Sequence, residues 1–181
     1  MSRFSRRIAA CMLTALMSAT AMASVNADLL VNDQGQPVSA AQLSGQWLLI
    51  SFGYSQCPDV CPTTLHRVTS VLSRLGAEGR ALVPYFVSVD PAHDNPAQLH
   101  RFLASFSPRI RGLTGSPSAL ADARRTFGVP VRGAGGGFDH GVFLYLVAPD
   151  GRVVETLHPD LSAEAMTQRI RQWMRASTVK S

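Results

Sequence analysis

Two cysteines separated by three residues, Cys57 and Cys61, are the side chains with the most evident chemistry in this sequence. Each precedes a proline, and the pair follows an apolar segment that ends at Gly53. Pro62 suits the first position of a helix, which predicts that Cys61 caps that helix and that its N-terminal N–H groups lower the thiol pKa. A residue before a proline favours extended backbone, so we expect both sulfur atoms at the tip of a loop.

The cysteine spacing makes a shared metal ion at least as natural as a disulfide. On a helix, Cβ atoms four residues apart lie about 5–6 Å from each other, whereas an unstrained disulfide places them roughly 3.8 Å apart. In a loop the two Cβ atoms are not held at this helical spacing, so a disulfide between the cysteines stays possible there. Thiolates bind copper(I), zinc or iron–sulfur clusters. Two sulfur ligands are too few for most zinc or cluster sites, so a metal site here needs another ligand.

Histidines are the candidates for that further ligand, and His140 has the most suggestive position. It lies between a glycine-rich stretch and an apolar segment, where a loop residue would be displayed at the edge of a sheet. The alternative is a turn histidine capped by Asp139. The remaining histidines are most simply surface residues: His66, His93, His100 and His158.

The elements that must position these residues follow from the hydrophobic pattern. A short strand and turn are predicted over residues 28–37. Apolar runs predict four further strands, over residues 47–52, 82–89, 142–147 and 152–157. Amphipathic spacing predicts four helices, which begin near Pro62, Pro96, Pro117 and Ala165. Helices alternating with strands, followed by a hairpin, imply a thioredoxin-like α/β fold with a central mixed β-sheet flanked by helices.

The N-terminal 27 residues have the layout of a secretory signal, with basic residues 1–7, an apolar run over 8–23 and small residues near 21–27. The apolar run has 16 residues, fewer than the roughly 20 that span a bilayer as a helix. We expect a cleaved signal peptide, with an uncleaved N-terminal membrane anchor as the alternative. The domain over 28–181 would then lie in the periplasm or at the outer face of the cytoplasmic membrane.

Composition excludes one class of partner. The 181 residues are 46% hydrophobic and 16% charged, which suits one folded domain. Three of the positive charges behind the net charge of +5 belong to Arg3, Arg6 and Arg7, within the expected signal. The remaining basic residues are scattered, so the domain lacks the clustered charge on which nucleic-acid binding depends.

Motifs along residues 28–175 carry a family resemblance. They are, in order, Gly53-Tyr54, Cys57-Pro58-Asp59-Val60-Cys61-Pro62-Thr63-Thr64-Leu65, Val87-Ser88-Val89-Asp90-Pro91, Pro108-Arg109, Gly112-Leu113-Thr114-Gly115, Asp139-His140, Tyr145-Leu146 and Pro149-Asp150-Gly151. Together they resemble the Sco/SenC family of copper metallochaperones. Ordered matches of this kind over nearly the whole domain are highly specific.

The resemblance implies one copper ion per domain, as Cu(I) or Cu(II), bound by Cys57, Cys61 and His140 on an extracytoplasmic thioredoxin fold. It also implies a role in assembling the binuclear copper centre of cytochrome c oxidase. The partner would be the copper-accepting subunit of the oxidase or another copper chaperone. Asp90 matches an acidic position of the family, and its plain role is to end a strand and cap the turn before Pro91.

Some family members are linked to thiol–disulfide exchange, so the alternative is an extracytoplasmic thiol–disulfide oxidoreductase that depends on a thiol reductant. In that enzyme Cys61 would attack and Cys57 would resolve the mixed disulfide. Thioredoxin-type enzymes, by resemblance, place a cis-proline opposite their cysteines, whereas the segment 139–141 contains no proline. This difference favours the metallochaperone. A peroxidase is the least favoured alternative. Peroxide chemistry usually requires a threonine and an arginine near the reactive cysteine; Thr63 and Thr64 lie close to Cys61 in the sequence, but no suitable arginine can be located from the sequence.

Overall fold

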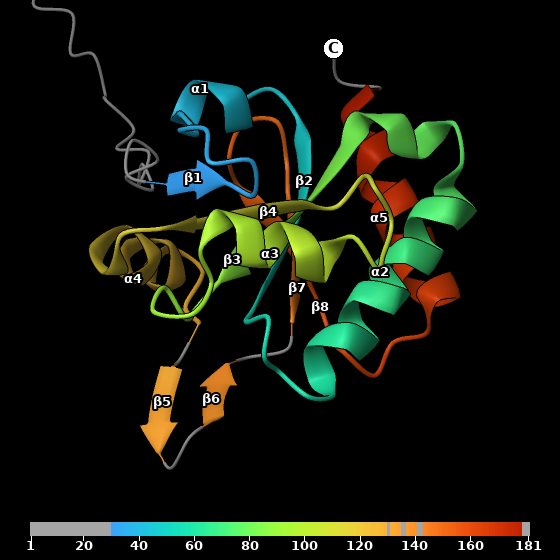
Figure 1. Cartoon of the computed structure of the whole chain (residues 1–181). Helices are drawn as coiled ribbons and strands as arrows, with labels where there is room; N and C mark the ends of the chain where they lie inside the picture. The colour runs from blue at the N-terminus through green and yellow to red at the C-terminus, as the bar shows by residue number, and fades with distance from the viewer. Residues whose placement is uncertain (1–29, 130, 135–136, 141–142, 179–181) are drawn as a thin grey trace, which may run out of the picture.

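Figure 1 shows the computed structural model of the chain, which describes residues 30–129, 131–134, 137–140 and 143–178. The predicted signal peptide or anchor, residues 1–27, lies outside the described residues. Within the described part of the chain, no helix is both long and apolar enough to cross a membrane.

Six strands form one sheet, in the order β1-β4-β3-β2-β7-β8, and β5 pairs with β6 in a separate hairpin. The described elements are β1 (Leu30–Asn32), α1 (Ala40–Leu43), β2 (Trp47–Gly53), α2 (Val60–Leu75), the short 3₁₀ helix η2 (Glu78–Ala81), β3 (Leu82–Ser88), α3 (Pro96–Leu103), β4 (Arg111–Gly115), α4 (Pro117–Thr126), β5 (Val131–Ala134), β6 (Gly137–His140), β7 (Leu144–Val147), β8 (Val153–Leu157) and α5 (Ala163–Thr178).

The sheet is mixed, as the sequence predicted. β2, β3 and β4 run parallel, while β1, β7 and β8 are antiparallel to their neighbours. Ile50 on β2 lies opposite Tyr85 on β3 and Tyr145 on β7. Every residue of β2 is buried, which explains why its sequence is apolar at nearly every position instead of alternating; the hydroxyl of the one polar side chain, Ser51, donates to the carbonyl oxygen of Tyr85.

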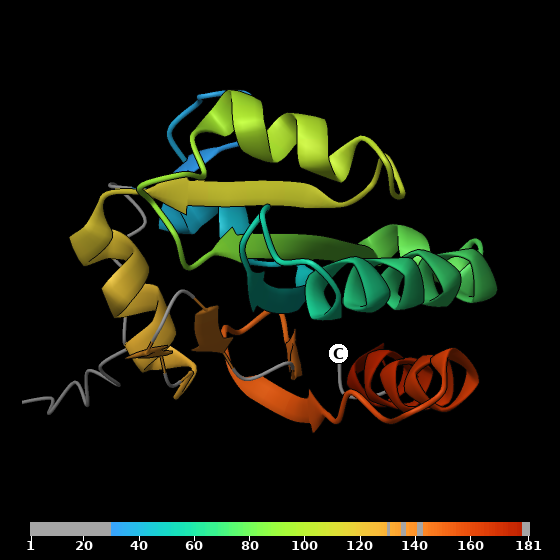
Figure 2. The ribbon, with the colours of Figure 1, turned by 60° about the horizontal axis from the view of Figure 1, so that its bottom comes forward.

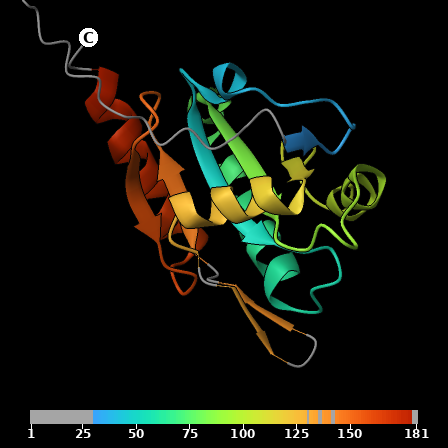
Figure 3. The ribbon, with the colours of Figure 1, turned by 90° about the vertical axis from the view of Figure 1, so that its left-hand side faces the viewer.

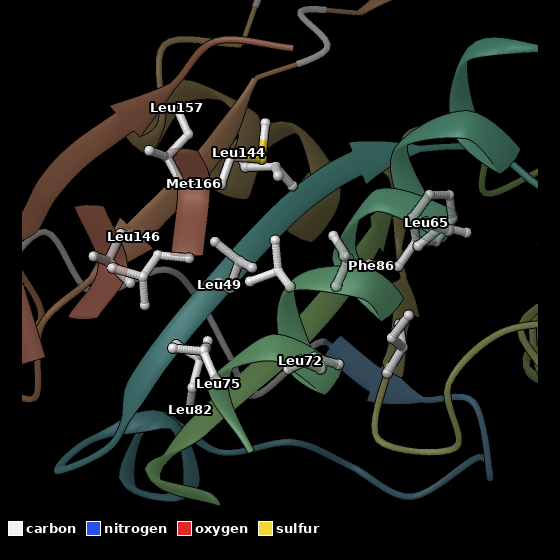
Figure 4. Close-up of a cluster of buried hydrophobic side chains, with 14 of the residues drawn as sticks. Leu49, Leu65, Leu72, Leu75, Leu82, Phe86, Leu144, Leu146, Leu157 and Met166 are labelled. Carbon is white, nitrogen blue, oxygen red and sulfur yellow. The ribbon is translucent and has the colours of Figure 1, made fainter. Parts of the chain in front are cut away.

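Helices cover both faces of this sheet. α2 and α5 lie side by side over one face (Figure 2), and α4 crosses the other (Figure 3). Alternate residues of β2 divide between the two cores, with Leu49 facing α2 and Ile50 facing α4. Figure 4 shows the core beneath α2 and α5, whose labelled side chains are Leu49, Leu65, Leu72, Leu75, Leu82, Phe86, Leu144, Leu146, Leu157 and Met166.

Two strand-forming segments differ from the sequence prediction. β4 was not predicted, because Arg111–Gly115 contains two glycines and a single large apolar residue, Leu113. Its strand conformation depends on pairing with β1 on one side and β3 on the other. The glycine-rich stretch, expected to be a loop, forms the strands of the β5–β6 hairpin on either side of residues 135–136.

One edge of the sheet gathers the segments that carry the candidate ligands. Gly53 at the end of β2 pairs with Ser88 at the end of β3, and Leu144 at the start of β7 pairs with Leu157 at the end of β8. The cysteine segment therefore leaves the sheet where the segment after β3 also leaves it. The β5–β6 hairpin projects from the end of the molecule at which α2 begins (Figures 1 and 3).

Candidate metal centre

The cysteine loop, residues 54–59, connects β2 to α2. In this loop the N–H of Cys57 donates to the carbonyl oxygen of Tyr54 across 3.2 Å and closes a turn. α2 begins at Val60 with Asp59 as its N-cap, two residues earlier than predicted. Cys61 is therefore the second residue of the helix, and the prediction that it stands in extended backbone before the helix is wrong.

Pro62 is compatible with this early start. The first turn of an α-helix leaves its N–H groups without helical partners, so a proline there sacrifices no hydrogen bond. The N–H of Thr63, the next residue, donates to the carbonyl oxygen of Asp59 across 3.1 Å. The preference of a residue before proline for extended backbone is thus overridden in the first turn of α2.

Both sulfur atoms belong to the core instead of the surface. Cys57 is 8% exposed and Cys61 is 2% exposed, and both pack in the cluster beneath α2 that contains Phe86. The two cysteines do not form a disulfide with each other. The backbone N–H of Cys61 donates to the Sγ atom of Cys57 across 3.4 Å, so the two side chains share one pocket.

Burial raises the pKa of the Cys61 thiol well above that of an ordinary cysteine. Its hydrogen bond with the side chain of Cys57 and the negative charges of Cys57 and Asp94 act in the same direction, and a backbone hydrogen bond at Tyr54 partly opposes them. The predicted lowering of this pKa by the helix terminus is therefore wrong. Loss of hydration outweighs the helix dipole because the sulfur lies inside the core.

Gly53 allows Cys61 to occupy this position. A Cβ atom added to Gly53 would lie 2.7 Å from Sγ of Cys61 and 2.6 Å from the ring of Phe86. Both separations are shorter than van der Waals contact, so no larger residue fits at the end of β2 without displacing the sulfur or the ring. The glycine that ends the apolar run is thus a packing requirement of the pocket.

His140 is the last residue of β6, and its backbone pairs with Val131 of β5. Its side chain lies outside the described residues, so its approach to the cysteines stays a prediction. Across the described side chains, no group of three or more histidine, cysteine, aspartate or glutamate residues is close enough to hold a metal ion.

The other histidines lie on the surface, as predicted. His66 is exposed and packs on Phe106 with ring centroids 4.9 Å apart. The remaining three are exposed and have carboxylate partners on their Nδ1 atoms: His93 with Asp90 at 2.7 Å, His100 with Asp33 at 2.8 Å and His158 with Asp160 at 3.2 Å.

Asp90 stands at the turn after β3, which agrees with the role predicted for it. Its carbonyl oxygen accepts the N–H groups of His93 and Asp94 at 3.2 and 2.9 Å.

Asp94 is the residue that sequence reasoning missed. It is buried, and its carboxylate accepts the N–H of Ser55 in the cysteine loop. The available signal was a second aspartate immediately before the Asn95-Pro96 helix start.

The donor set of this pocket suits a soft metal ion. Two buried sulfur atoms match the ligand preference of copper(I), and a histidine nitrogen would also accommodate copper(II). With only two thiolates, the pocket is short of the four ligands of a structural zinc site.

Comparison with known proteins decides the family. The model of the SCO1/SenC family matches residues 20–175. The chain belongs to the SCO1/SenC family. Among its SCO1/SenC relatives is the mouse protein SCO2 homolog, mitochondrial, which is 35% identical over 155 residues. That alignment covers 81% of this chain and 61% of the mouse protein, so the chain spans about three fifths of that relative's length.

Solved SCO1/SenC structures share the fold described above. The crystal structure of Arabidopsis thaliana ScoI with copper bound has a TM-score of 0.77 and 28% identity, and the match covers 82% of this chain and 96% of that one. BsSco is described as a member of the Sco family of cytochrome c oxidase assembly proteins with a disulfide switch. It has a TM-score of 0.69 and 27% identity, with coverage of 81% and 91%. The thioredoxin-like fold predicted from the sequence is confirmed.

Proposed function

We propose that this chain binds one copper ion through Cys57, Cys61 and His140 and delivers it for assembly of the binuclear copper centre of cytochrome c oxidase. The observation that carries the proposal is the pair of buried thiols joined by the Cys61 N–H to Cys57 Sγ hydrogen bond at 3.4 Å. Relatives with the same fold, such as Arabidopsis thaliana ScoI, have been solved with copper bound.

The position of the hairpin supports His140 as the third ligand. β6 ends at His140, and the hairpin that contains it projects from the end of the molecule where the cysteine loop lies (Figure 1). A ligand on a separate hairpin can leave the metal without unfolding the sheet. This suits a carrier, which must release its copper ion as well as bind it.

Transfer would proceed by ligand exchange at the more accessible sulfur. Cys57 is 8% exposed and precedes the exposed Pro58, whereas Cys61 is 2% exposed. Ligands of the recipient would therefore replace His140 and Cys57 first, with Cys61 as the last ligand to leave. Copper remains coordinated throughout, which avoids its release into solution.

The signal predicted over residues 1–27 would place this exchange outside the cytoplasm, in the periplasm or at the outer face of the cytoplasmic membrane. The recipient would be the copper-accepting subunit of the oxidase or a further copper chaperone. A thiol reductant in the same compartment would keep Cys57 and Cys61 reduced, because only thiolates bind the metal.

A transfer experiment tests the proposal. The copper-loaded chain is mixed with the metal-free copper-binding domain of the oxidase subunit, and formation of the binuclear centre is followed by its absorption spectrum. We expect the centre to form, and to form more slowly when the carrier is Cys57→Ser. Binding of copper without any transfer to this domain would contradict the delivery role.

A thiol–disulfide oxidoreductase is the second candidate, and the unequal exposure of the two cysteines favours it, because an attacking cysteine must be more accessible than a resolving one. Cys57, the more exposed cysteine, would attack a partner disulfide and release one partner thiolate. Cys61 would then attack the sulfur of Cys57, release the second partner thiolate and leave an oxidised chain. The roles predicted from the sequence are thus exchanged, because Cys61 is the buried cysteine with the raised pKa.

The two functions separate in a reductase assay with glutathione as the reductant. The oxidoreductase needs both cysteines but not His140, so turnover that survives His140→Ala would support it. The copper carrier predicts that His140→Ala weakens copper binding, whatever its effect on disulfide exchange.

A further inference from the structure

Asp94 ties the cysteine loop to the rest of the sheet. It is 1% exposed and lies between β3 and α3. Its carboxylate accepts the backbone N–H of Ser55, at 3.1 and 3.2 Å from the two oxygens, and the hydroxyl of Ser88 at 2.7 Å. Ser55 is in the turn that leads to Cys57, and Ser88 ends β3, so one carboxylate joins both segments.

The backbone of Asp94 is itself fixed. Its carbonyl oxygen accepts the hydroxyl of Thr114 on β4 at 2.7 Å, and its N–H donates to Asp90 at 2.9 Å. The next residue, Asn95, caps α3 by accepting the N–H of Gln98 at 2.9 Å. Through these hydrogen bonds Asp94 holds the cysteine loop in a fixed position relative to β3, β4 and α3.

The carboxylate also brings a negative charge to the pocket. In the described part of the chain its contacts are hydrogen bonds from N–H and O–H groups, and none is an ion pair. A buried carboxylate without a cation is unusual, because buried charges are normally paired or placed near a metal ion. The field of Asp94 reaches the sulfur of Cys61, where it disfavours a further negative charge.

We propose that Asp94 positions the cysteine loop through the N–H of Ser55 and biases the pocket toward Cu(II) over Cu(I). This inference rests on the proposed copper site. Two thiolates and a neutral imidazole give a Cu(I) site a net charge of −1 and leave a Cu(II) site neutral. A nearby buried carboxylate repels the Cu(I) site, whose net charge is −1, and has no net charge to repel in the Cu(II) site. It therefore lowers the affinity for Cu(I) relative to that for Cu(II).

Two substitutions separate position from charge. Asp94→Asn keeps an oxygen that can accept the N–H of Ser55 but removes the charge, whereas Asp94→Ala removes both. Affinities for Cu(I) and for Cu(II) are measured on the full chain by competition with chromophoric chelators. We expect Asp94→Asn to raise the ratio of Cu(I) to Cu(II) affinity roughly tenfold with the thiolate-to-Cu(II) absorption band unmoved. Asp122→Asn, which changes an exposed pair with Arg125 on α4, is the control and should leave the ratio unchanged.

Thiol reactivity of the metal-free protein tests the positioning role without copper. We expect a disulfide reagent to react with Cys57 several-fold faster in Asp94→Ala than in Asp94→Asn, which should stay close to the parent protein. Ser88→Ala removes the hydrogen bond from its hydroxyl to Asp94, and the one that this hydroxyl accepts from the N–H of Asp90, without altering charge. It should increase reactivity by a smaller factor. This variant keeps the test available if Asp94→Ala does not fold.

The outcomes differ for each claim. An affinity ratio unchanged in Asp94→Asn would overturn the charge effect. Thiol reactivity unchanged in Asp94→Ala, or in Ser88→Ala if Asp94→Ala does not fold, would overturn the positioning role. A parent protein that binds no copper would instead refute the proposed function and with it the Cu(II) preference. In that case the reactivity measurement still decides whether Asp94 positions the loop.

Discussion

The backbone N–H of Cys61 points at the sulfur of Cys57, 3.4 Å away, and makes the two cysteines chemically unequal. Cys57 accepts this hydrogen bond and is the more exposed of the two, at 8% against 2% for Cys61. Cys61 lies deeper, and burial raises its pKa. Cys57 is therefore suited to exchange metal ligands or disulfides, and Cys61 is suited to retain the metal ion or to resolve the mixed disulfide formed at Cys57.

We expect Cys57 to be alkylated at least about tenfold faster than Cys61 in reduced, metal-free protein at neutral pH, because the thiolate is the reactive form. The measurement uses Cys61→Ser, which leaves Cys57, and Cys57→Ser, which leaves Cys61, both combined with Cys11→Ser. Iodoacetamide incorporation is followed by mass spectrometry. Equal rates, or faster reaction at Cys61, would show that burial does not control reactivity in this pocket.

The raised pKa of Cys61 also predicts how stability depends on pH. Above the ordinary cysteine pKa of about 8.5 the unfolded chain loses this proton while the folded chain keeps it, so the free energy of unfolding falls as pH rises. We expect the Tm of the reduced, metal-free protein to fall from about pH 8.5 upward. The contribution of Cys61 to this fall in Tm should be absent in Cys61→Ala. An identical dependence of Tm on pH in the parent protein and in Cys61→Ala would exclude Cys61 as the source of the fall.

Much of the frame that carries the site was predictable. The apolar runs that became β2 and β3 are buried on both faces, and the Asn95-Pro96 and Ser116-Pro117 pairs do begin α3 and α4 with side-chain caps. These signals are local, since each depends on a few adjacent residues. They were enough to predict the mixed sheet.

The interior of the site was not predictable, because it depends on contacts between distant segments. The burial of Cys61 arises from the close approach of Gly53 and Phe86, which belong to two different strands. The carboxylate of Asp94 meets the N–H of Ser55 across 39 residues of sequence. Local preference alone placed Cys61 at an exposed cap and gave its pKa shift the wrong sign.

Gly53→Ala tests the packing beneath the sulfur. The added methyl group must displace Cys61 Sγ or the ring of Phe86, and we expect a loss of about 1–3 kcal/mol in the free energy of unfolding together with weaker copper binding. Chemical denaturation and chelator competition measure the two effects.

Gly112→Ala is the matched control, because its added Cβ atom would lie 2.7 Å from Leu99, away from the cysteines. It should lose similar stability and keep the copper affinity of the parent protein. Equal loss of copper affinity in both variants would mean that general destabilisation, and not the position of Cys61, explains the effect at Gly53.

The shared copper ion is tested most directly by titrating the reduced chain with Cu(I) in competition with a chromophoric chelator, in the parent protein, in His140→Ala and in His158→Ala. We predict one equivalent in the parent protein, an affinity at least tenfold lower in His140→Ala, equivalent to about 1.4 kcal/mol, and no change in His158→Ala, whose imidazole lies on the surface beside Asp160. One equivalent bound as tightly by His140→Ala as by the parent protein would contradict the three-residue site.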